Sequence, residues 1–164
     1  MSGQTPRYLI ALGSNRRHHR HGPPRRVLAA ATAALEAAGL EVLAASPLIT
    51  TRPQGPALRD FANGAAVVAS EFLPDEVLVR LKAIERDFGR RQGRRWGERV
   101  LDLDLILWEG GAWSSPGLTV PHPAFRCRAF VLRPALAVAA DWRDPLTGLS
   151  VRHLRARLRR PRAG

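Results

Sequence analysis

The chain has 164 residues, the size of one globular domain, and is long enough to bury a core without disulfides or structural metal ions. Hydrophobic residues make up 45% of it and charged residues 24%, which argues against a disordered chain. No apolar run approaches the ~18 residues that a membrane span needs, no signal peptide is recognised, and the single cysteine, Cys127, excludes an internal disulfide. We therefore expect a single domain over residues 1–164, with a basic helix and tail from about 150 to 164, in a reducing cytoplasm and outside any membrane.

The net charge of +12 is unusual, and it is concentrated in three arginine-rich segments. Residues 16–26 hold five arginines, residues 86–99 hold six arginines and two acids, and residues 151–164 hold six arginines and no acid. Guanidinium groups bind planar oxyanions through paired hydrogen bonds, so a polyphosphate or a nucleic acid is the expected partner. The alternative is a solvated surface in a chain that prefers arginine to lysine, above all for the two outer segments.

Turn residues and the spacing of apolar residues predict strands that alternate with helices. In a short chain this alternation predicts an α/β sandwich with one sheet. The glycine patterns of Rossmann and P-loop nucleotide sites do not occur in the sequence. The expected order is a strand at 8–12, a helix at 27–38, a strand-like stretch at 40–51 that Pro47 interrupts, a loop at 52–60, a strand at 61–72, a helix at 74–88, a basic loop at 89–98, a strand at 99–108, a turn at 110–111, an extended stretch at 119–123, and helices at 130–140 and 149–158.

The stretch at 100–107 alternates between apolar residues and aspartate, which predicts a strand with two different faces. Asp102 and Asp104 share one face, about 7 Å apart at ~3.3 Å per residue. Two carboxylates at that spacing suit Mg²⁺, which binds few carboxylates and keeps positions for water and phosphate oxygens. Two solvent-facing acids are the simpler alternative, although the neighbouring arginines count against it. The residues expected on the other face are Leu101, Leu103, Leu105 and Leu107.

The arginine-rich loop at 89–98 carries three glycines, which allow it to change conformation. Its arginines repel one another unless an anion neutralises them, so we expect a lid that a bound triphosphate orders and closes. Trp96 either closes over a flat ligand or anchors the loop through its hydrophobic ring, and the sequence favours neither role.

Several short motifs follow one another between residue 7 and about residue 150. The run from Arg95 to Asp104 reads R-W-G-E-R-V-L-D-L-D, and the other motifs are Ala11-Leu12-Gly13-Ser14-Asn15, Thr51-x-Pro53-x-Gly55-Pro56, Phe61-x-Asn63, Leu118-Thr119-Val120-Pro121-His122 and Arg128-Ala129-Phe130. Together they resemble the 6-hydroxymethyl-7,8-dihydropterin pyrophosphokinase family, whose signature is R-W-G-x-R-x-[IL]-D-[IL]-D. A D-x-D motif alone is common, but this order and spacing over nearly the whole chain make the resemblance specific.

The resemblance implies a ferredoxin-like α+β sandwich, with a single antiparallel-rich sheet and helices packed on it. It implies a transferase of folate biosynthesis, which moves the terminal pyrophosphoryl unit of ATP to the hydroxymethyl oxygen of the pterin and releases AMP. ATP and the pterin are then the expected partners, and two Mg²⁺ ions are the expected cofactors. We expect a cytoplasmic monomer.

The resemblance also implies the roles of individual residues. Asp102 and Asp104 would bind the two Mg²⁺ ions, and Arg90 and Arg99 would hold the phosphates, which makes these four the expected catalytic residues. The rings of Phe61 and Phe130 would stack on the two faces of the pterin, although without the resemblance both would be assigned to the core. The implied ATP-binding residues are Glu85, Arg90, Gln92, Trp96, Arg99, Leu105, Thr119, His122 and Arg128. The implied pterin-binding residues are Thr51, Arg52, Pro53, Gln54, Phe61, Asn63, Trp96 and Phe130.

The sequence departs from the family's pattern in several places. The segment at 16–26, rich in arginine and histidine, stands where the family usually begins a helix. Its histidines are expected to be solvated rather than bound to a metal. These are His18, His19 and His21. The other departures are Ile49, Phe61, Gly93, Gly117 and Pro123, which leave the details of phosphate binding open.

Other functions remain open from the sequence. A non-catalytic paralogue would keep the fold and bind a pterin or a nucleotide without turnover. A basic nucleic-acid-binding module would use the arginines of the C-terminal helix, but it leaves Asp102 and Asp104 unexplained, because carboxylates repel DNA unless they hold a metal. A metal-dependent nuclease would explain both features, but it needs no aromatic pocket. Steep salt dependence would identify nucleic-acid binding, whereas Mg²⁺ dependence would identify chemistry on ATP.

Overall fold

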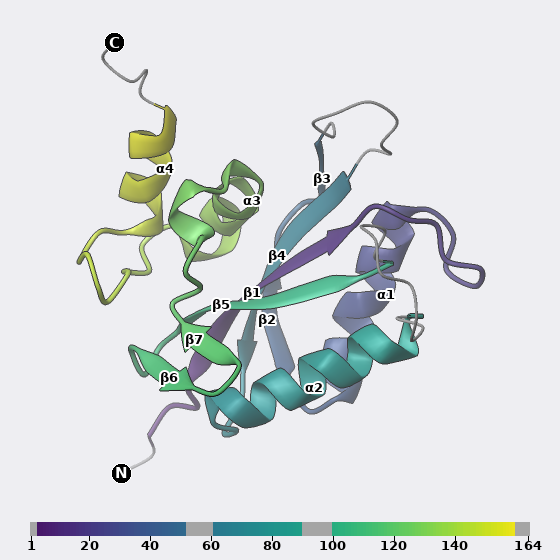
Figure 1. The fold of residues 1–164 in the computed structure, drawn as a ribbon, viewed down its shortest axis with the longest axis horizontal. Coiled ribbons are helices and arrows are strands. Elements are labelled where there is room, and N and C mark those ends of the chain that lie inside the picture. The colour runs from purple at the N-terminus through teal and green to yellow at the C-terminus, as the bar shows by residue number, and fades with distance from the viewer. Residues whose placement is uncertain (1–2, 52–60, 90–99, 160–164) are drawn as a thin grey trace.

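The structure, a computed structural model, describes residues 3–51, 61–89 and 100–159. Strands and helices alternate through the first part of the chain (Figure 1). Within the described ranges no helix has the length and apolar character that crossing a membrane requires. The elements are β1 (Arg7–Ser14), α1 (Pro24–Ala37), β2 (Glu41–Ala45), β3 (Ile49–Thr51), β4 (Phe61–Ala69), α2 (Pro74–Asp87), β5 (Asp102–Trp108), β6 (Trp113–Ser115), β7 (Leu118–Val120), the short 3₁₀ helix η1 (Phe125–Cys127), α3 (Ala129–Ala139) and α4 (Val151–Arg159).

The main sheet is antiparallel and has the strand order β2-β4-β1-β5, with β3 paired to β4 as well. Along the chain, the order is strand, helix, paired strands, helix and strand, and the last strand, β5, lies at an edge. This is the ferredoxin-like arrangement that the family resemblance implies. A separate two-stranded hairpin, β6–β7, follows β5.

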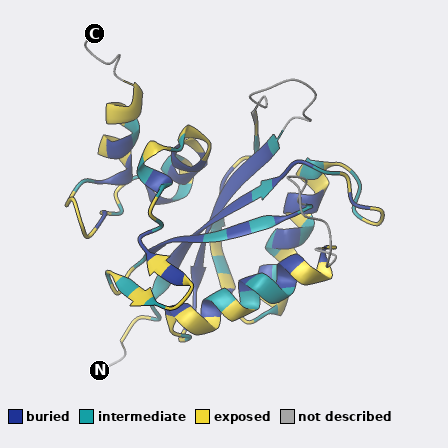
Figure 2. Cartoon of the chain, viewed as in Figure 1, coloured by how far each residue is buried: buried dark blue, intermediate teal, exposed yellow. Residues whose placement is uncertain are grey.

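Each face of the sheet is covered by its own hydrophobic core. Residues of α1 and α2 pack on one face, and residues of α3 and α4 pack on the other (Figure 1). Because side chains alternate along a strand, Ile10 and Leu12 of β1 belong to the first core, whereas Leu9 and Ala11 belong to the second. Figure 2 shows that the middle strands are buried along most of their length. The α3 face is therefore the place to look for polar side chains that packing does not explain.

One leucine of β5 does not lie on the predicted face. The register pairs Leu9 with Leu107 and Ile10 with Leu105, so Ile106 is an extra residue that forms a β-bulge. Leu105 consequently belongs to the core beneath α1 and α2, while Leu107 lies with Ile106 in the core beneath α3. A bulge depends on the register between two strands, which the sequence of one strand does not determine.

The strand-like stretch predicted at 40–51, with its interruption at Pro47, forms two strands. β2 and β3 lie on either side of Pro47, which has no N–H for a ladder hydrogen bond, and both pair with β4. Helix α1 begins at Pro24, three residues before the predicted start, because the missing N–H of a proline leaves no bond unmade in a first turn. The helix predicted across Pro134 is present as α3.

The histidine-rich segment after β1 is not the fully solvated loop that we predicted. His18 is only 7% exposed, and its ring stacks on His19 and His21 and lies against Phe88 at the end of α2. His19 is exposed, as expected. The local sequence gives no sign of this burial, because Phe88 lies far along the chain.

Candidate active site

Asp102 and Asp104 lie on the α3 side of the sheet. In the register with β1, Asp102 lies opposite Gly13 and Asp104 lies opposite Ala11, which belongs to the core beneath α3. Leu103, between them, is buried on the other side. Both aspartates are partly exposed. The alternation predicted for this part of β5 is confirmed.

Glu85 of α2 fixes the outer edge of β5. Its side chain is 2% exposed; one carboxylate oxygen accepts a hydrogen bond from the Leu103 N–H at 2.9 Å, and the other accepts one from Lys82 Nζ at 3.1 Å. A buried carboxylate needs such partners, because burial without them is strongly unfavourable. Leu103 lies between the two aspartates, so this bond holds the backbone that carries them. These contacts let Glu85 position the backbone of β5, and the ATP contact that the resemblance implies for Glu85 stays a prediction.

A cleft of about 350 Å³ opens along the free edge of β5, between α2 and the β6–β7 hairpin. This volume lies within the range of small-molecule sites. Four of the predicted site residues line it, together with Lys82, the only lysine of the chain. The four are Asp104, Leu105, Thr119 and His122.

The β6–β7 hairpin is tied across this cleft to the first turn of α2. The indole N–H of Trp113 donates to Asp75 Oδ1 at 3.1 Å, and the Ser115 hydroxyl donates to the same oxygen at 2.5 Å. The turn between the two strands contains Gly117 with φ of +82°, a left-handed conformation that favours glycine. The departure from the family at this position therefore has a local structural reason. The hairpin presents the exposed Thr119 to the cleft.

His122 follows β7 and is held in one orientation. Its backbone N–H donates to the Ile106 carbonyl of β5 at 3.0 Å, and the Nδ1 atom of its ring accepts a hydrogen bond from the Ala124 backbone N–H at 3.1 Å. Burial lowers the pKa of His122, Asp104 partly opposes this shift, and Arg128 adds to it. The ring is therefore neutral at pH 7, and its proton is on Nε2 because Nδ1 is an acceptor. The site thus contains an oriented N–H donor close to a carboxylate.

A buried ion pair anchors the segment that precedes α3. Arg126 binds both oxygens of the fully buried Asp144, at 2.5 and 2.8 Å. Burial raises the pKa of the Asp144 carboxyl, but hydrogen bonds from Arg126, Thr147 and the Leu146 N–H outweigh it and lower the pKa to about 2. This pair fixes η1 directly before the first residues of α3.

Phe61 and Asn63 lie on the same side of β4 as Ala65, which packs beneath α3. Asn63 pairs with Gly13 of β1, and Gly13 pairs in turn with Asp102 of β5. A Cβ atom at Gly13 would come within 3.3 Å of Asn63 Oδ1. Because Gly13 has no Cβ atom, the Asn63 amide has room beside it. Asn63, Gly13 and Asp102 form one row across strands β4, β1 and β5.

The side chain of Phe130, in the first turn of α3, is 43% exposed. Neither Phe130 nor the half-buried Phe61 belongs to the two hydrophobic cores, and the guanidinium of Arg128 lies 5.7 Å from the centre of the Phe130 ring. Among the described residues no ring contact joins the two phenylalanines. Both rings are therefore free to contact a flat ligand, which is the role that the resemblance implies for them.

The structure places the described site residues on β4, β5, and the segment from β7 to α3. Thr51 ends β3 opposite Phe61. The residues so placed are Phe61, Asn63, Asp102, Asp104, Leu105, Thr119, His122, Arg128 and Phe130, with Glu85 behind β5. The lid predicted at 89–98 lies outside the described residues except for Gly89, and so do the predicted roles of Arg52, Pro53, Gln54, Arg90, Gln92, Trp96 and Arg99.

Sequence reasoning missed three residues of this site. Lys82 precedes Glu85 by three positions on a helix, a spacing that brings side chains together and was a usable signal. Asp75 and Ser115 meet only because the hairpin folds back over α2, and no local pattern indicates that contact.

The two aspartates form a donor set that Mg²⁺ fits. They offer carboxylate oxygens from one side of one strand, and the cleft beside Asp104 leaves space for phosphate groups and water. The described part of the chain contains no group of three or more His, Cys, Asp or Glu side chains that could hold a metal ion. Mg²⁺ usually takes one or two carboxylates and completes its coordination with water and substrate phosphates. Asp102 and Asp104 therefore suit an ion that arrives with a polyphosphate.

Comparisons with known proteins extend these observations. A family model described as 7,8-dihydro-6-hydroxymethylpterin-pyrophosphokinase matches residues 9–140. A relative from Synechocystis, named 2-amino-4-hydroxy-6-hydroxymethyldihydropteridine pyrophosphokinase, is 38% identical over 144 residues, which cover 87% of this chain and 71% of the relative. A relative of the same name from Pseudomonas aeruginosa is 40% identical over 141 residues, which cover 85% of this chain and 84% of the relative.

Among solved structures, the crystal structure of Plasmodium falciparum HPPK-DHPS covers 96% of this chain with a TM-score of 0.73 and 13% sequence identity. This chain spans 45% of that longer chain, so the likeness concerns the fold of one part of it. The family match and the relatives at 38% and 40% identity support a conclusion about the family as well as the fold, because they cover most of this chain. The chain belongs to the 7,8-dihydro-6-hydroxymethylpterin-pyrophosphokinase family.

Proposed function

We propose that this chain transfers the pyrophosphoryl group of ATP to the hydroxymethyl oxygen of 6-hydroxymethyl-7,8-dihydropterin and releases AMP, as a step of folate biosynthesis. Membership of the family supports this activity. The structural observation that carries the proposal is that Asp102 and Asp104 share one face of the sheet with Phe61 and Asn63, beside the cleft at β5. One face thus combines acidic groups for a metal-bound polyphosphate with apolar and amide groups for a flat heterocycle.

In this reaction the hydroxymethyl oxygen bonds to the β-phosphorus of ATP. The bond between that phosphorus and the oxygen shared with the α-phosphate breaks, AMP leaves with that oxygen, and the hydroxyl proton passes to solvent. Such a transfer needs little covalent chemistry from the protein, because positioning and charge neutralisation lower most of the barrier. The task of this chain's residues is therefore to hold two substrates in line.

We assign ATP to the cleft at the free edge of β5. Lys82 supplies a positive charge, the Thr119 hydroxyl supplies a polar contact, and Leu105 contributes apolar surface. The neutral ring of His122 presents Nε2–H as a donor for a phosphate oxygen, because its Nδ1 is already occupied. Arg128 follows η1, which the buried Arg126 pair fixes, and adds positive charge near the proposed phosphates.

We assign the pterin to the side of the sheet that carries Phe61 and Asn63. The rings of Phe61 and Phe130 are left out of both cores and are the proposed stacking surfaces. The Asn63 amide offers both a donor and an acceptor, which matches the mixed polar edge of a pterin. Because Asn63 lies in the same cross-strand row as Asp102, the heterocycle would be held beside the metal-binding carboxylates.

Asp102 and Asp104 are the proposed ligands of two Mg²⁺ ions that bind with ATP. When bound, Mg²⁺ neutralises phosphate oxygens and makes the phosphorus more electrophilic. Glu85 contributes indirectly, since its hydrogen bond to the Leu103 N–H keeps the two aspartates at a fixed position on β5. We further propose that the chain works as a monomer in the cytoplasm, with ATP and the pterin as its partners.

The test is incubation of the protein with ATP, Mg²⁺ and 6-hydroxymethyl-7,8-dihydropterin, followed by chromatographic separation of the nucleotides. We expect AMP to appear only when the pterin is present. ADP as the nucleotide product, or AMP formation that does not depend on the pterin, would overturn the proposal.

A further inference from the structure

The segment between β1 and α1 carries a group of side chains that the proposed reaction does not use. His18 and Gly22 are joined by two backbone hydrogen bonds, of 2.8 and 2.9 Å, which close residues 18–22 into a tight loop. The rings of His19 and His21 stack on the His18 ring, with centroids 4.3 and 4.7 Å away. The His21 ring also stacks on Phe88 at 5.1 Å. The loop is thereby held against the end of α2.

The His18 ring has one occupied nitrogen and one free nitrogen. Its Nδ1 accepts hydrogen bonds from the Arg20 N–H at 3.0 Å and the His21 N–H at 3.1 Å, so the ring proton is on Nε2. Burial lowers the pKa of His18, and the neighbouring histidines and Arg20 add to this effect, so the ring is neutral at pH 7. In the described ranges no acceptor for the Nε2–H is found, although His18 is more than nine-tenths buried. The ring therefore presents a fixed donor.

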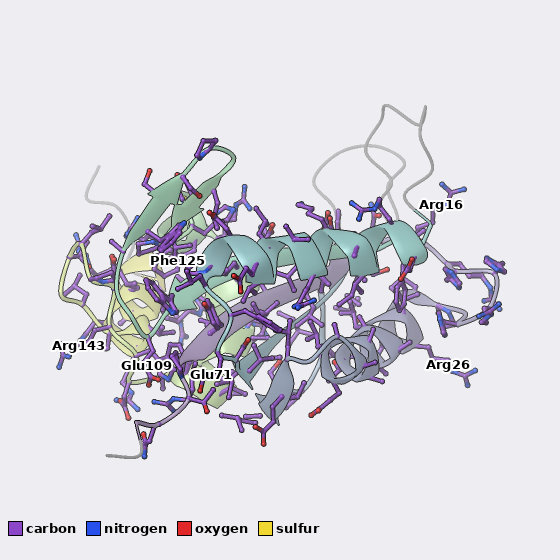
Figure 3. The ribbon with its side chains drawn as sticks, turned by 90° about the horizontal axis from the view of Figure 1, so that it is seen from below. Arg16, Arg26, Glu71, Glu109, Phe125 and Arg143 are labelled. Carbon is purple, nitrogen blue, oxygen red and sulfur yellow. The ribbon has the colours of Figure 1, made fainter. Side chains whose placement is uncertain are left out.

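A second cleft, of about 290 Å³, opens beside this ring. It lies at the C-terminal end of α2, whereas the cleft assigned to ATP lies farther along the same helix, beside Leu78 and Lys82. Figure 3 shows Arg16 near the C-terminal end of α2, at this end of the molecule. The lining residues that matter here are Arg16, Arg17, His18, His19, Asp87 and Phe88.

Among the described residues that line the cleft, arginines outnumber carboxylates. Arg16 and Arg17 carry positive charge, while Asp87 and the carbonyl end of α2 oppose an anion. Arg17 is exposed, and no carboxylate partner for it is found within residues 3–51, 61–89 and 100–159. A guanidinium with no carboxylate partner and a fixed N–H donor therefore line the same small cleft.

We propose that this cleft binds a small phosphoryl anion, orthophosphate or pyrophosphate, with the Arg17 guanidinium and the His18 Nε2–H as its donors. A guanidinium presents paired N–H groups that match phosphate oxygens, and a donor on a fixed ring loses little freedom when it binds. The faces of the His18 ring are already stacked on neighbouring histidines, so they are not available to a nucleotide base. None of the described residues that line this cleft lines the cleft assigned to ATP. Gly89 and Val100 also line it, and they border residues 90–99, which lie outside the described part of the chain.

Calorimetric titration of the whole protein with orthophosphate and, separately, with pyrophosphate tests the proposal. A non-hydrolysable ATP analogue is present at saturation, and the Mg²⁺ concentration is equal in both solutions, so that the proposed catalytic site is filled. We expect one binding site for at least one of the two anions. The anion with the lower dissociation constant is the preferred ligand. Arg17→Ala is expected to weaken binding at least about tenfold, as the loss of charged hydrogen bonds does.

Arg26→Ala is the matched control, because Arg26 lies in α1 outside the cleft and its loss changes the net charge equally (Figure 3). We expect this variant to keep the affinity within about twofold. Equal weakening by Arg17→Ala and Arg26→Ala would overturn the proposal, because it would mark non-specific charge attraction. The proposal would also be overturned if both anions bind without the ATP analogue but not with it. That result would place the anion in the cleft at β5.

Two substitutions of His18 separate the roles of its ring nitrogens. His18→Asn keeps an oxygen near Nδ1 for the two backbone N–H groups but has no donor near Nε2, and we expect at least about fivefold weaker binding in the folded variant, with a lower melting temperature because the ring contacts are lost. His18→Gln offers a donor near Nε2 but loses the acceptor that closes the loop. Wild-type affinity in a folded His18→Asn variant would overturn the role of Nε2. The comparison of Arg17→Ala with Arg26→Ala remains decisive if the His18 variants do not fold.

Discussion

Phe130 is a large apolar side chain left exposed at the beginning of a helix, where the hydrophobic effect would favour burial. If it stacks on the pterin, Phe130→Ala should weaken pterin affinity about tenfold, since stacking on one aromatic ring contributes ~1–3 kcal/mol. The affinity for an ATP analogue should stay within about twofold, because the cleft at β5 is unchanged. Fluorescence titrations with the two ligands measure both values.

Phe125→Ala provides the matched control for this prediction. Phe125 is fully buried in the core beneath α3, so its removal should lower the melting temperature strongly, whereas Phe130→Ala should hardly change it. A melting temperature for Phe130→Ala as low as that for Phe125→Ala would assign Phe130 to packing. An equal loss of affinity for both ligands would contradict the stacking role as well.

His18 and His122 make the stability of the protein depend on pH. Burial lowers the pKa of both rings below the ordinary value of 6.5, so the unfolded chain binds protons more readily than the folded chain on the acid side of that value. The free energy of unfolding should therefore be constant above about pH 7 and should fall as the pH drops below about 6.5. Urea unfolding at pH 7.5 and pH 5.5 measures the difference.

His122→Asn tests the assignment of this effect. An asparagine oxygen can still accept the hydrogen bond from the Ala124 N–H, but the side chain does not titrate. The variant should lose less stability than the wild type between the two pH values. Equal losses would show that His122 does not contribute to the pH dependence.

One carboxylate, that of Asp75, joins the β6–β7 hairpin to α2 by hydrogen bonds. Asp75→Ala removes the acceptor of both the Trp113 N–H and the Ser115 hydroxyl, so the hairpin that carries Thr119 is no longer tied to α2. We expect the KM for ATP to rise by about three- to tenfold while kcat stays within about twofold. The lost contact binds ATP equally in the ground state and the transition state, and the reacting groups do not move. Steady-state kinetics at saturating pterin separates the two constants.

Asp75→Asn and Ser114→Ala are the controls for this element. An asparagine oxygen still accepts hydrogen bonds, so Asp75→Asn should recover most of the ATP affinity. Ser114 is exposed on the same hairpin, and its loss should leave the KM unchanged. A normal KM in Asp75→Ala would show that the hairpin does not bind ATP.

At the level of elements, the sequence predicts most of what the structure contains. Apolar spacing and turn residues predict the alternation of strands and helices, and the alternation around Asp102 predicts that both carboxylates share one face of the strand. The β-bulge at Ile106 is not predicted, because it depends on how β5 pairs with β1. The burial of His18 is missed for the same kind of reason, since its packing surface is supplied by Phe88 of α2.

The site is less predictable than the fold, because its parts come from distant segments. The motifs identify Phe61, Asp104 and His122 through the family resemblance, whereas composition and periodicity alone would assign Phe61 and His122 to structural roles. Asp75 and Ser115 are recognised only once the hairpin is seen to lie against α2. Contacts of this kind depend on the three-dimensional arrangement and leave no periodic pattern in the sequence.

At the scale of the molecule, the Arg126–Asp144 pair joins η1 to the segment that leads into α4. Asp144→Ala leaves the guanidinium without its buried partner, so the free energy of unfolding should fall by about 3 kcal/mol and the melting temperature by roughly 6–12 °C. In the folded protein the pKa of Asp144 is about 2, below the ordinary value of 3.8. The stabilisation from the ionised Asp144 carboxylate is therefore present at neutral pH and is lost as the pH falls from 3.8 through about 2. Thermal unfolding at pH 7 and pH 2 measures both effects.

Asp141→Ala is the matched control, because the pair of Asp141 with Arg152 is exposed to solvent. An exposed ion pair contributes little, so the melting temperature should change by no more than about 1 °C. Superimposable melting curves for Asp144→Ala and the wild type at pH 7 would contradict the anchoring role of the buried pair.

The role of the C-terminal helix, α4, can be seen only from its packing in the whole molecule. Its arginines suggested a nucleic-acid surface, but Val151 and Leu154 are buried in the core beneath α3, and Arg152 pairs with Asp141. Helix α4 is thus a packing element of the enzyme domain whose exposed face is basic. The family comparisons favour the transferase over the nucleic-acid alternative.

The central claim is that Asp102 and Asp104 serve a pterin-dependent transfer from ATP, and the rate of AMP release tests it most directly. The rate is measured with Mg²⁺ and the pterin in the wild type, in Asp102→Asn, in Asp104→Asn and in Asp141→Asn, whose exposed carboxylate is the control. We predict one AMP for each diphosphorylated pterin in the wild type and in Asp141→Asn. We predict a rate at least about 100-fold lower in the other two variants, with unchanged melting temperatures. Wild-type rates in either Asp102→Asn or Asp104→Asn, or AMP release without the pterin, would contradict the account.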